Sequence, residues 1–347
     1  MTLPRALVVA VFAALAAAAP GALAGTGMAP LRISRLAQPA PPFRDAVLRR
    51  PPVRFGQTGT DPEGTYTTKD GVGVHVVFPG LSAPDAVAGQ STADFLGALL
   101  HGPELSTLTV ELGAFTTVQE ACGIVALACY YPGEHKLFVP TSLPPGNEVP
   151  IEQILAHEYG HHVAASRSNP PWPAVDWGPK RWATYMRVCP HAFAGDMFPG
   201  DESAGYELNP GEGWAEAFRL ANSLRIGTWP DIGWPIVADV FLPDTTALAL
   251  VGQDVLTPWV ATPSRQLSGV LRRGQVRRIR IATPLDGTAR ATATGPAGIR
   301  VAFVNGRGSR QSAGGRSATT TVCGARTTVV TVQAKRAGRF ALAYTTP

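Results

Sequence analysis

Residues 149–163, VPIEQILAHEYGHHV, contain the pattern His-Glu-x-x-His, on which the interpretation of the whole chain depends. On a helix, His157 and His161 lie about one turn apart on one face, where their ring nitrogens can bind one Zn²⁺. Zinc lowers the pKa of a bound water towards about 7, and Glu158 is placed to take its proton and pass it to a leaving amine. The pattern therefore predicts peptide hydrolysis without a covalent intermediate, against the alternative of a chance match on an amphipathic helix.

The residues around the pattern favour a helix. Pro150 suits the first turn, where a missing N–H has no cost, and Ile151, Ile154 and Leu155 form an apolar stripe. Gly160 is unexpected inside a helix, where it costs about 1 kcal/mol relative to alanine. Its presence predicts that another element approaches the metal-binding face closely.

The N-terminus has the features of an export signal. Arg5 precedes an apolar run, residues 6–19, that is short for a membrane span, and Ala22-Leu23-Ala24 is typical of a cleavage site. We therefore expect residues 1–24 to be a signal peptide and the mature protein to be secreted, with an N-terminal membrane anchor as the alternative. No later apolar run is long enough for a membrane span.

Four cysteines fit an oxidising compartment. Cys122 and Cys129 flank a short apolar stretch and are expected to close a small loop by a disulfide. Cys189 and Cys323 then remain, either as a long-range pair or as free thiols. Because the sequence has no C-x-x-C spacing, cysteine ligands for zinc are not expected.

The 347 residues are enough for one good-sized domain and a smaller one, and the net charge of +5 is mild. Positive charge is concentrated in one stretch, with arginines at positions 272, 273, 277, 278 and 280. Such a stretch is either a solvated strand face or a surface for a polyanion or an anionic cell envelope. No motif for nucleic-acid binding accompanies it.

Periodicity and turn residues divide the remaining chain. Residues 25–70 are rich in proline and arginine and predict an extended arm, which is a linker, a prosegment or a strap over the domain. Residues 71–260 are expected to form one domain that contains both strands and helices. Its expected elements before the helix with the His-Glu-x-x-His pattern are strands at 73–78, 108–112, 124–131 and 136–139 and a helix at 83–100.

A catalytic zinc needs a third protein ligand and an open position. We look for the third ligand in residues 209–219, NPGEGWAEAFR, where Asn209 is a good N-cap and Pro210 suits the first helical position. Glu212 is the preferred ligand, and Glu216, one turn on, would accept the free N–H of a histidine ligand. Two alternatives stay open: Glu216 binds the metal, or Glu212 only caps its own helix.

The H-E-x-G-H pattern at 157–161, followed by E-x-x-A-E at 212–216, resembles the gluzincin metallopeptidases over about residues 70–230. In these zinc peptidases two helix-borne histidines and a glutamate from a later helix hold the metal. The first glutamate is the ligand in toxin-type and small bacterial members, and this carries over to Glu212. The resemblance implies an α+β zincin-like domain, with a mixed sheet, an active-site helix and a glutamate-bearing helix. It also implies an insertion between His161 and Glu212.

The resemblance also implies a tyrosine or histidine that steadies the developing oxyanion. Tyr206 stands where toxin-type members carry such a tyrosine; it is this residue or a plain loop tyrosine, and Tyr185 and His191 are the other candidates. An edge strand before the active-site helix, at 124–131 or 136–139, is implied as the place where substrate backbone pairs antiparallel.

The composition changes after residue 262, where charge, alternation, glycine and threonine increase. Short strands are expected at 276–282, 290–293, 299–304, 327–334 and 338–345. This spacing predicts a small all-β sandwich domain over 263–347. The stretch 282–287, ATPLDG, is similar to the C-terminal domains that follow secreted bacterial peptidases.

Together these features predict a secreted zinc metallopeptidase, an endopeptidase with one catalytic Zn²⁺ that acts on peptide or protein substrates. The alternative is a secreted envelope-binding or adhesin-like protein with a structural or degenerate zinc site. In that case the C-terminal domain and its arginines would be the functional parts. A zinc amidase that cleaves cell-wall peptides would use the same chemistry on another substrate.

Overall fold

The computed structural model describes residues 44–52, 60–147, 149–228, 236–304 and 315–347. The predicted signal peptide, 1–24, and the first part of the predicted arm lie outside these residues. Within them the chain is mixed α and β, as expected, with helices around one mixed sheet in the N-terminal part and two further sheets near the C-terminus. No helix in the described ranges has both the length and the apolar character needed to cross a membrane.

The first sheet has the strand order β1-β2-β3-β5-β4. Its strands are β1 (Glu63–Thr67), β2 (Gly73–Val77), β3 (Thr109–Gly113), β4 (Cys129–Tyr131) and β5 (Lys136–Pro140). Strands β2, β3 and β5 are parallel, and β1 and β4 are antiparallel edge strands. Two segments were candidates for the edge strand before the active-site helix. The first, 124–131, contains β4, which is at the edge of the sheet, whereas the second forms β5, which is inside the sheet.

The expected strand at 124–131 is wrong in extent. Only Cys129–Tyr131 is a strand, and helix α2, Phe115–Cys122, precedes it where the sequence predicted no element. The disulfide between Cys122 and Cys129 joins the end of α2 to the start of β4. Gly123, at φ 105°, begins the turn between them, and this backbone conformation breaks the alternation on which the prediction was based.

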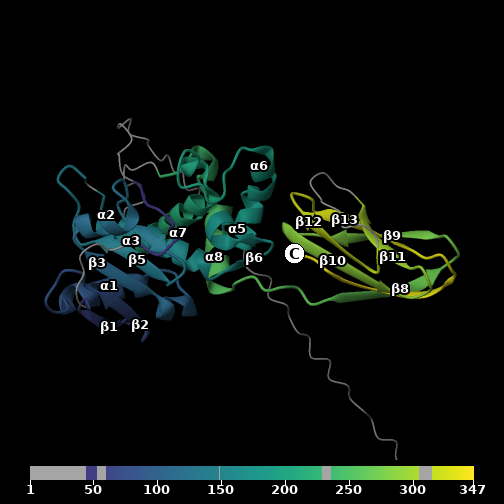
Figure 1. Cartoon of the computed structure of the whole chain (residues 1–347), viewed down its shortest axis with the longest axis horizontal. Helices are drawn as coiled ribbons and strands as arrows, with labels where there is room; N and C mark the ends of the chain where they lie inside the picture. Colours follow the sequence, from purple (N-terminus) through teal and green to yellow (C-terminus); the bar gives the residue numbers. More distant parts are fainter. Residues whose placement is uncertain (1–43, 53–59, 148, 229–235, 305–314) are drawn as a thin grey trace, which may run out of the picture. The chain divides into compact units, whose positions relative to one another are not determined.

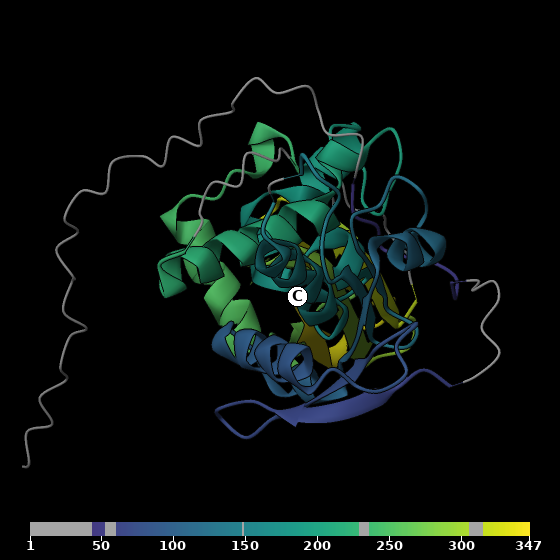
Figure 2. The ribbon, with the colours of Figure 1, turned by 90° about the vertical axis from the view of Figure 1, so that its left-hand side faces the viewer.

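Helices cover the first sheet and extend beyond it. The main helices are α1 (Ala86–Ala98), α3 (Ile151–Ala165), α7 (Pro210–Ile226) and α8 (Thr245–Leu256). Shorter elements are α4 (Ala174–Trp177), α5 (Lys180–Tyr185), α6 (Val188–Ala194), β6 (Ser168–Asn169), β7 (Trp172–Pro173) and 3-10 turns at Pro103–Thr107, Tyr206–Leu208 and Asp239–Phe241. Figures 1 and 2 show α1 beside the hairpin of β1 and β2. Helix α3 lies between the sheet and α7.

This central position makes α3 differ from the expected amphipathic helix. Residues 153–164 are all buried, so that polar and charged side chains are enclosed along with apolar ones. The close approach predicted at Gly160 is confirmed. A Cβ at this position would lie 2.9 Å from Ala215 Cα of α7. Trp214 Nε1 donates to the Gly160 carbonyl at 3.0 Å, which joins the two helices at this approach.

The C-terminal strands form two antiparallel sheets around one apolar core. Their orders are β12-β10-β14-β8 and β11-β13-β9. The strands are β8 (Arg265–Leu271), β9 (Val276–Ala282), β10 (Gly287–Thr294), β11 (Arg300–Val304), β12 (Ser317–Val322), β13 (Thr327–Gln333) and β14 (Gly338–Thr345). Val301, Val330 and Leu342 are buried in the shared core. Strands β8 and β12 were not predicted, because serine, threonine and glycine weaken their apolar alternation.

A disulfide and buried hydrogen bonds tie these sheets to the helices. Cys189 of α6 is bonded to Cys323, so the long-range pair is formed and neither thiol is free. The Lys180 amine donates to the carbonyls of Pro170 at 2.9 Å and Asp286 at 2.8 Å. Burial lowers the pKa of Lys180 to about 8.

Candidate metal centre

Helix α3 directs His157 and His161 towards α7. The two rings are one helical turn apart, with centroids separated by 5.0 Å, and both side chains are buried. Their Nε2 atoms face the same point, as the spacing predicts. His162, on another face, instead lies with Nε2 2.9 Å from the Glu104 carbonyl and Nδ1 3.1 Å from the Tyr130 hydroxyl.

Glu212 enters from the first turn of α7. Its Oε2 lies 3.2 Å from His157 Nε2 and 3.3 Å from His161 Nε2. The helix cap is supplied by Asn209, whose side chain accepts from Gly211 N at 3.0 Å. Glu212 is therefore turned to the histidines and is not a capping-box residue.

Glu216, one turn along α7, is held by Arg219. The guanidinium donates to both carboxylate oxygens, at 2.8 and 2.5 Å, and the Arg219 charge lowers the pKa of Glu216 although burial opposes this. Glu216 Oε2 lies 3.6 Å from His157 Nδ1, which is longer than a hydrogen bond. The position beside the ring nitrogen that faces away from Glu212 is the one expected of an orienting carboxylate.

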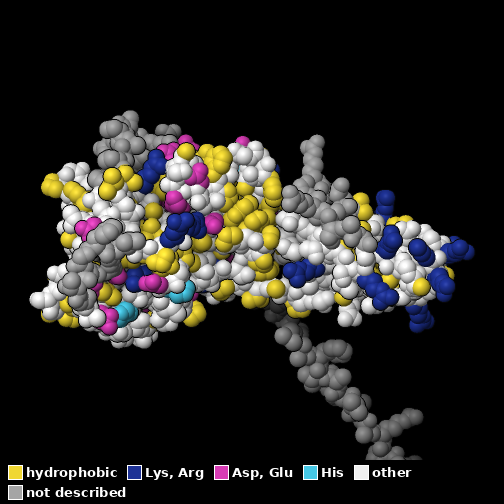
Figure 3. Space-filling model, in the orientation of Figure 1, with side chains coloured by type: hydrophobic (Ala, Val, Ile, Leu, Met, Phe, Trp, Pro, Cys, Tyr) yellow, Lys and Arg dark blue, Asp and Glu magenta, His cyan; other side chains and the backbone are white. Residues whose placement is uncertain are grey.

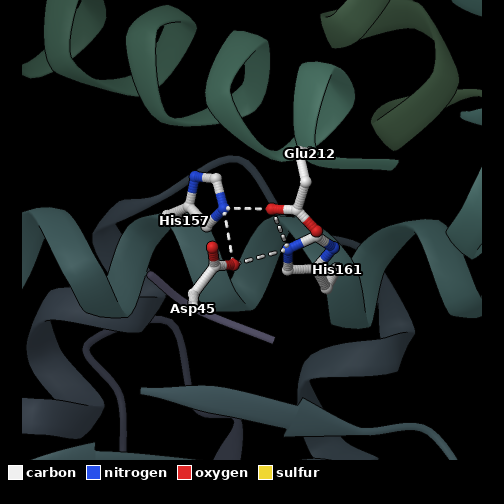
Figure 4. Close-up of side chains that lie close together, drawn as sticks. All are labelled: Asp45, His157, His161 and Glu212. Atoms are coloured by element: carbon white, nitrogen blue, oxygen red, sulfur yellow. Dashed lines mark hydrogen bonds and ion pairs between the residues drawn. The ribbon is translucent and has the colours of Figure 1, made fainter. Parts of the chain in front are cut away.

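Asp45 completes the cluster and was not predicted. Its Oδ2 lies 3.0 Å from His157 Nε2 and 3.2 Å from His161 Nε2. Figure 4 shows Asp45 and Glu212 reaching the histidines from opposite sides. Asp45 belongs to the arm, at separations of 112 and 116 residues from the two histidines, and no local pattern marks it.

These four side chains could hold one metal ion. One donor atom from each lies within 4.8 Å of every other, and all four residues are buried. Donors about 2.0–2.1 Å from a tetrahedral ion lie about 3.3 Å from one another, and the histidine–carboxylate distances here are 3.0–3.3 Å. Two imidazoles and two carboxylates are also donors that zinc accepts. The structure thus supports a metal site, while the identity of the metal stays a prediction.

Glu158 lies next to this cluster with an unusual lack of partners. It is fully buried, and among the described residues neither of its carboxylate oxygens has a hydrogen-bond partner. Burial, and then the charge of Asp45, raise the pKa of Glu158 well above its usual range. A buried carboxyl without partners is costly to maintain, which is typical of a group retained for chemistry or for a bound ion.

The negative charges of the nearby carboxylates favour the protonated form of both histidines. Burial alone would lower the pKa of His157, but the carboxylates of Asp45 and Glu212 raise it well above the ordinary value. The same balance, with Glu212 and Asp45, raises the pKa of His161 to about 10. A metal ion bound at this site would compete with protons for the imidazole nitrogens.

Tyr206 is buried beside the cluster. Its hydroxyl donates to Asp45 Oδ1, the oxygen turned away from the histidines. The other two candidates for the same role have partners elsewhere: Tyr185 donates to Asp244 Oδ2 at 2.6 Å, and His191 lies 3.4 Å from Asp196. Tyr206 is thus the candidate that the fold brings to the centre.

No protein-family model matches the sequence, and a search of curated proteins also finds no match.

Proposed function

We propose that this protein is a secreted zinc-dependent peptidase with a gluzincin-type site on a zincin-like domain. The observation that carries the proposal is Glu158, a buried carboxyl without a partner in the described chain, next to a cluster of four side chains that could hold a metal ion. A purely structural zinc site has no need of such a group. The two disulfides agree with an oxidising compartment outside the cytosol.

Each residue has a role that follows from its position. His157, His161 and Glu212 would hold the ion, and Glu216, fixed by Arg219, would orient His157. Zinc bound there would supply a Lewis acid that polarises a peptide carbonyl and acidifies water. Glu158 would accept the proton of the attacking water and return it to the leaving amine.

Tyr206 would donate its hydroxyl to the negative charge that develops on the carbonyl oxygen. The hydrogen bond of this hydroxyl to Asp45, whose other carboxylate oxygen lies close to both histidines, supports this role. Substrate would bind as an extended peptide along β4, since this edge strand precedes α3 and has main-chain groups that are not used by β5.

Two observations favour the alternative of an envelope-binding protein with a structural metal. The cluster has four protein donors, as closed structural sites do. The arginines at 272, 273, 277, 278 and 280 are all exposed, and Figure 3 shows Lys and Arg side chains gathered over the C-terminal strands. Such a surface would suit an anionic polymer.

Zinc content and hydrolysis of unfolded casein by the same sample distinguish the two. In the Asp45→Ala background, which leaves three donors, we expect one zinc per chain and casein cleavage. Adding Glu158→Gln should keep the zinc and lower turnover by several orders of magnitude, whereas adding His161→Ala should lose the zinc. Equal hydrolysis with and without the Glu158→Gln change would refute the proposal.

A further inference from the structure

We propose that residues 44–48, here called the arm segment, occupy the place beside β4 at this site where a substrate peptide would lie. Asp45 then stands at the position of the reacting group, and the intact chain is a latent form. The inference rests on the proposed function, because it names the substrate's binding mode and the regulation of the same centre.

The arm segment is bound to the domain as an added strand. Arg44 N donates to the Val125 carbonyl at 2.6 Å, and the Arg44 carbonyl accepts from Leu127 N at 2.6 Å. Further along, the Ala46 carbonyl accepts from Tyr130 N at 2.9 Å, and Leu48 N donates to the Tyr130 carbonyl at 2.8 Å. The two bonds with Tyr130 use the outer edge of β4, and the two with Val125 and Leu127 are made to the residues just before this strand. The arm segment runs parallel to this edge, opposite to the antiparallel direction expected of a substrate peptide at the same place.

Side chains of the arm segment alternate as in a strand. Asp45 and Val47 are buried, and Val47 joins the main apolar core. Ala46 and Leu48 are half-buried and pack against the smaller cluster around Phe138. The alternation places the Asp45 carboxylate at the metal centre, since one face of the added strand is turned towards α3.

Polar contacts hold the segment at both ends. The Arg44 guanidinium donates to the Ser203 carbonyl at 2.9 Å and lies 5.1 Å from the centre of the Tyr206 ring. Just beyond the segment, Arg49 pairs with Asp176 at 2.5 Å. The segment is thus bound by its backbone, by its core residue and by flanking charges, in addition to Asp45.

The contacts of Asp45 are those that a reacting peptide would need. One carboxylate oxygen lies close to Nε2 of both histidines, so Asp45 would occupy a metal position that a catalytic site needs open. The other oxygen takes the Tyr206 hydroxyl. Since a side-chain carboxylate and not a peptide carbonyl is presented, the arm segment offers no bond for hydrolysis while it closes the site.

Cobalt substitution tests this without relying on activity, because the visible spectrum of Co²⁺ reports its ligands. Full-length wild type, Asp45→Ala and the isosteric Asp45→Asn are loaded with Co²⁺ and titrated with acetohydroxamate, a small metal-binding probe. Arg50→Ala, at an exposed residue beyond the arm segment, is the control. Casein hydrolysis by the zinc forms is measured in parallel.

We expect that acetohydroxamate does not change the Co²⁺ spectrum of wild type or of Arg50→Ala. Both Asp45 variants should keep one Co²⁺, show an altered spectrum and bind the probe. Their casein hydrolysis should rise by about tenfold or more, because the fraction of molecules with an open site sets the apparent rate. Asp45→Asn keeps the outcome interpretable if Asp45→Ala fails to fold.

Wild type that binds acetohydroxamate as well as the variants do would overturn the proposal, and so would loss of the metal from folded Asp45→Asn. If the variants bind the probe but cleave nothing, the closed site stands and the peptidase function fails. If wild type cleaves casein as fast as the variants, latency fails and the peptidase function stands.

Discussion

Gly160 of α3 and Ala215 of α7 mark the closest approach of the two helices that carry the metal donors. A Cβ on Gly160 would lie 2.9 Å from Ala215 Cα and 3.3 Å from Ala215 Cβ, closer than side chains pack. His161 and Glu212 lie within one turn of this contact. The separation of histidines and glutamate is therefore set by the absence of a side chain at position 160.

Gly160→Ala should destabilise the protein and weaken metal binding. Overpacking costs about 1–3 kcal/mol, which exceeds the gain of about 1 kcal/mol in helix propensity. Urea unfolding and competition with a chelator measure the two effects. Gly252→Ala in α8 is the matched control, since a Cβ there meets no described atom within 4 Å, and it should be neutral or stabilising. Equal behaviour of the two variants would contradict the role of the contact.

Glu212 and Glu216 should differ in how strongly they affect metal affinity. Glu212→Gln removes a donor that faces both histidines, so zinc should be lost to a moderate chelator. Glu216→Gln should lower zinc affinity only about 10–100-fold, as expected for a residue that orients a ligand. Glu152→Gln, exposed in the first turn of α3, is the control. A larger loss with Glu216→Gln would reverse the assignment of the third ligand.

Stability should fall at acid pH through Glu104. Its carboxylate accepts from Gly102 N at 2.7 Å and from Arg167 at 3.0 Å. Burial opposes ionisation, but Arg167 and the backbone donor outweigh it and lower the pKa of Glu104 below 4.5. The unfolded chain then binds more protons, so this contribution is complete above pH 4.5 and is lost as pH falls through the folded pKa.

Glu104→Gln should therefore lower the free energy of unfolding at pH 7 by about 3–5 kcal/mol, because Arg167 stays buried without its charge partner. The variant should also lose less stability than wild type between neutral and acid pH. Chemical denaturation across this range measures both quantities. Glu134→Gln, at an exposed pair with Lys136, is the control and should be nearly neutral. An unchanged pH slope in Glu104→Gln would contradict the assignment.

Tyr206→Phe should lower kcat about a hundredfold with little change in KM, if its hydroxyl stabilises charge that develops only in the transition state. The comparison belongs in the Asp45→Ala background, where Asp45 no longer takes the hydroxyl. Tyr185→Phe, whose hydroxyl is engaged with Asp244, is the matched control. Equal kcat in the two phenylalanine variants would leave Tyr206 as a plain buried tyrosine.

Short-range patterns account for a large part of this protein. Residues 151–165 form the predicted helix, with Pro150 as the N-cap just before the first turn, and Asn209 and Pro210 begin α7 as expected. The i and i+4 spacing alone places both imidazoles on one face. The pair Cys122 and Cys129 is close in sequence, and its disulfide is confirmed. Each of these features depends on residues that are a few positions apart.

Other relationships arise only when the chain folds: Asp45 meets the histidines, Arg219 lies 2.6 Å from Gln153 in a buried contact, and Cys189 meets Cys323. The sequence of an extended segment does not indicate which strand it pairs with. Its backbone hydrogen bonds are made to β4 and the residues just before it, and not within the segment itself. The arm was predicted as a linker, a prosegment or a strap, and its contact with β4, which is distant in the chain, was not apparent from the sequence. Local patterns were enough to locate the donors on α3 and α7, whereas long-range packing determined which further carboxylate meets them.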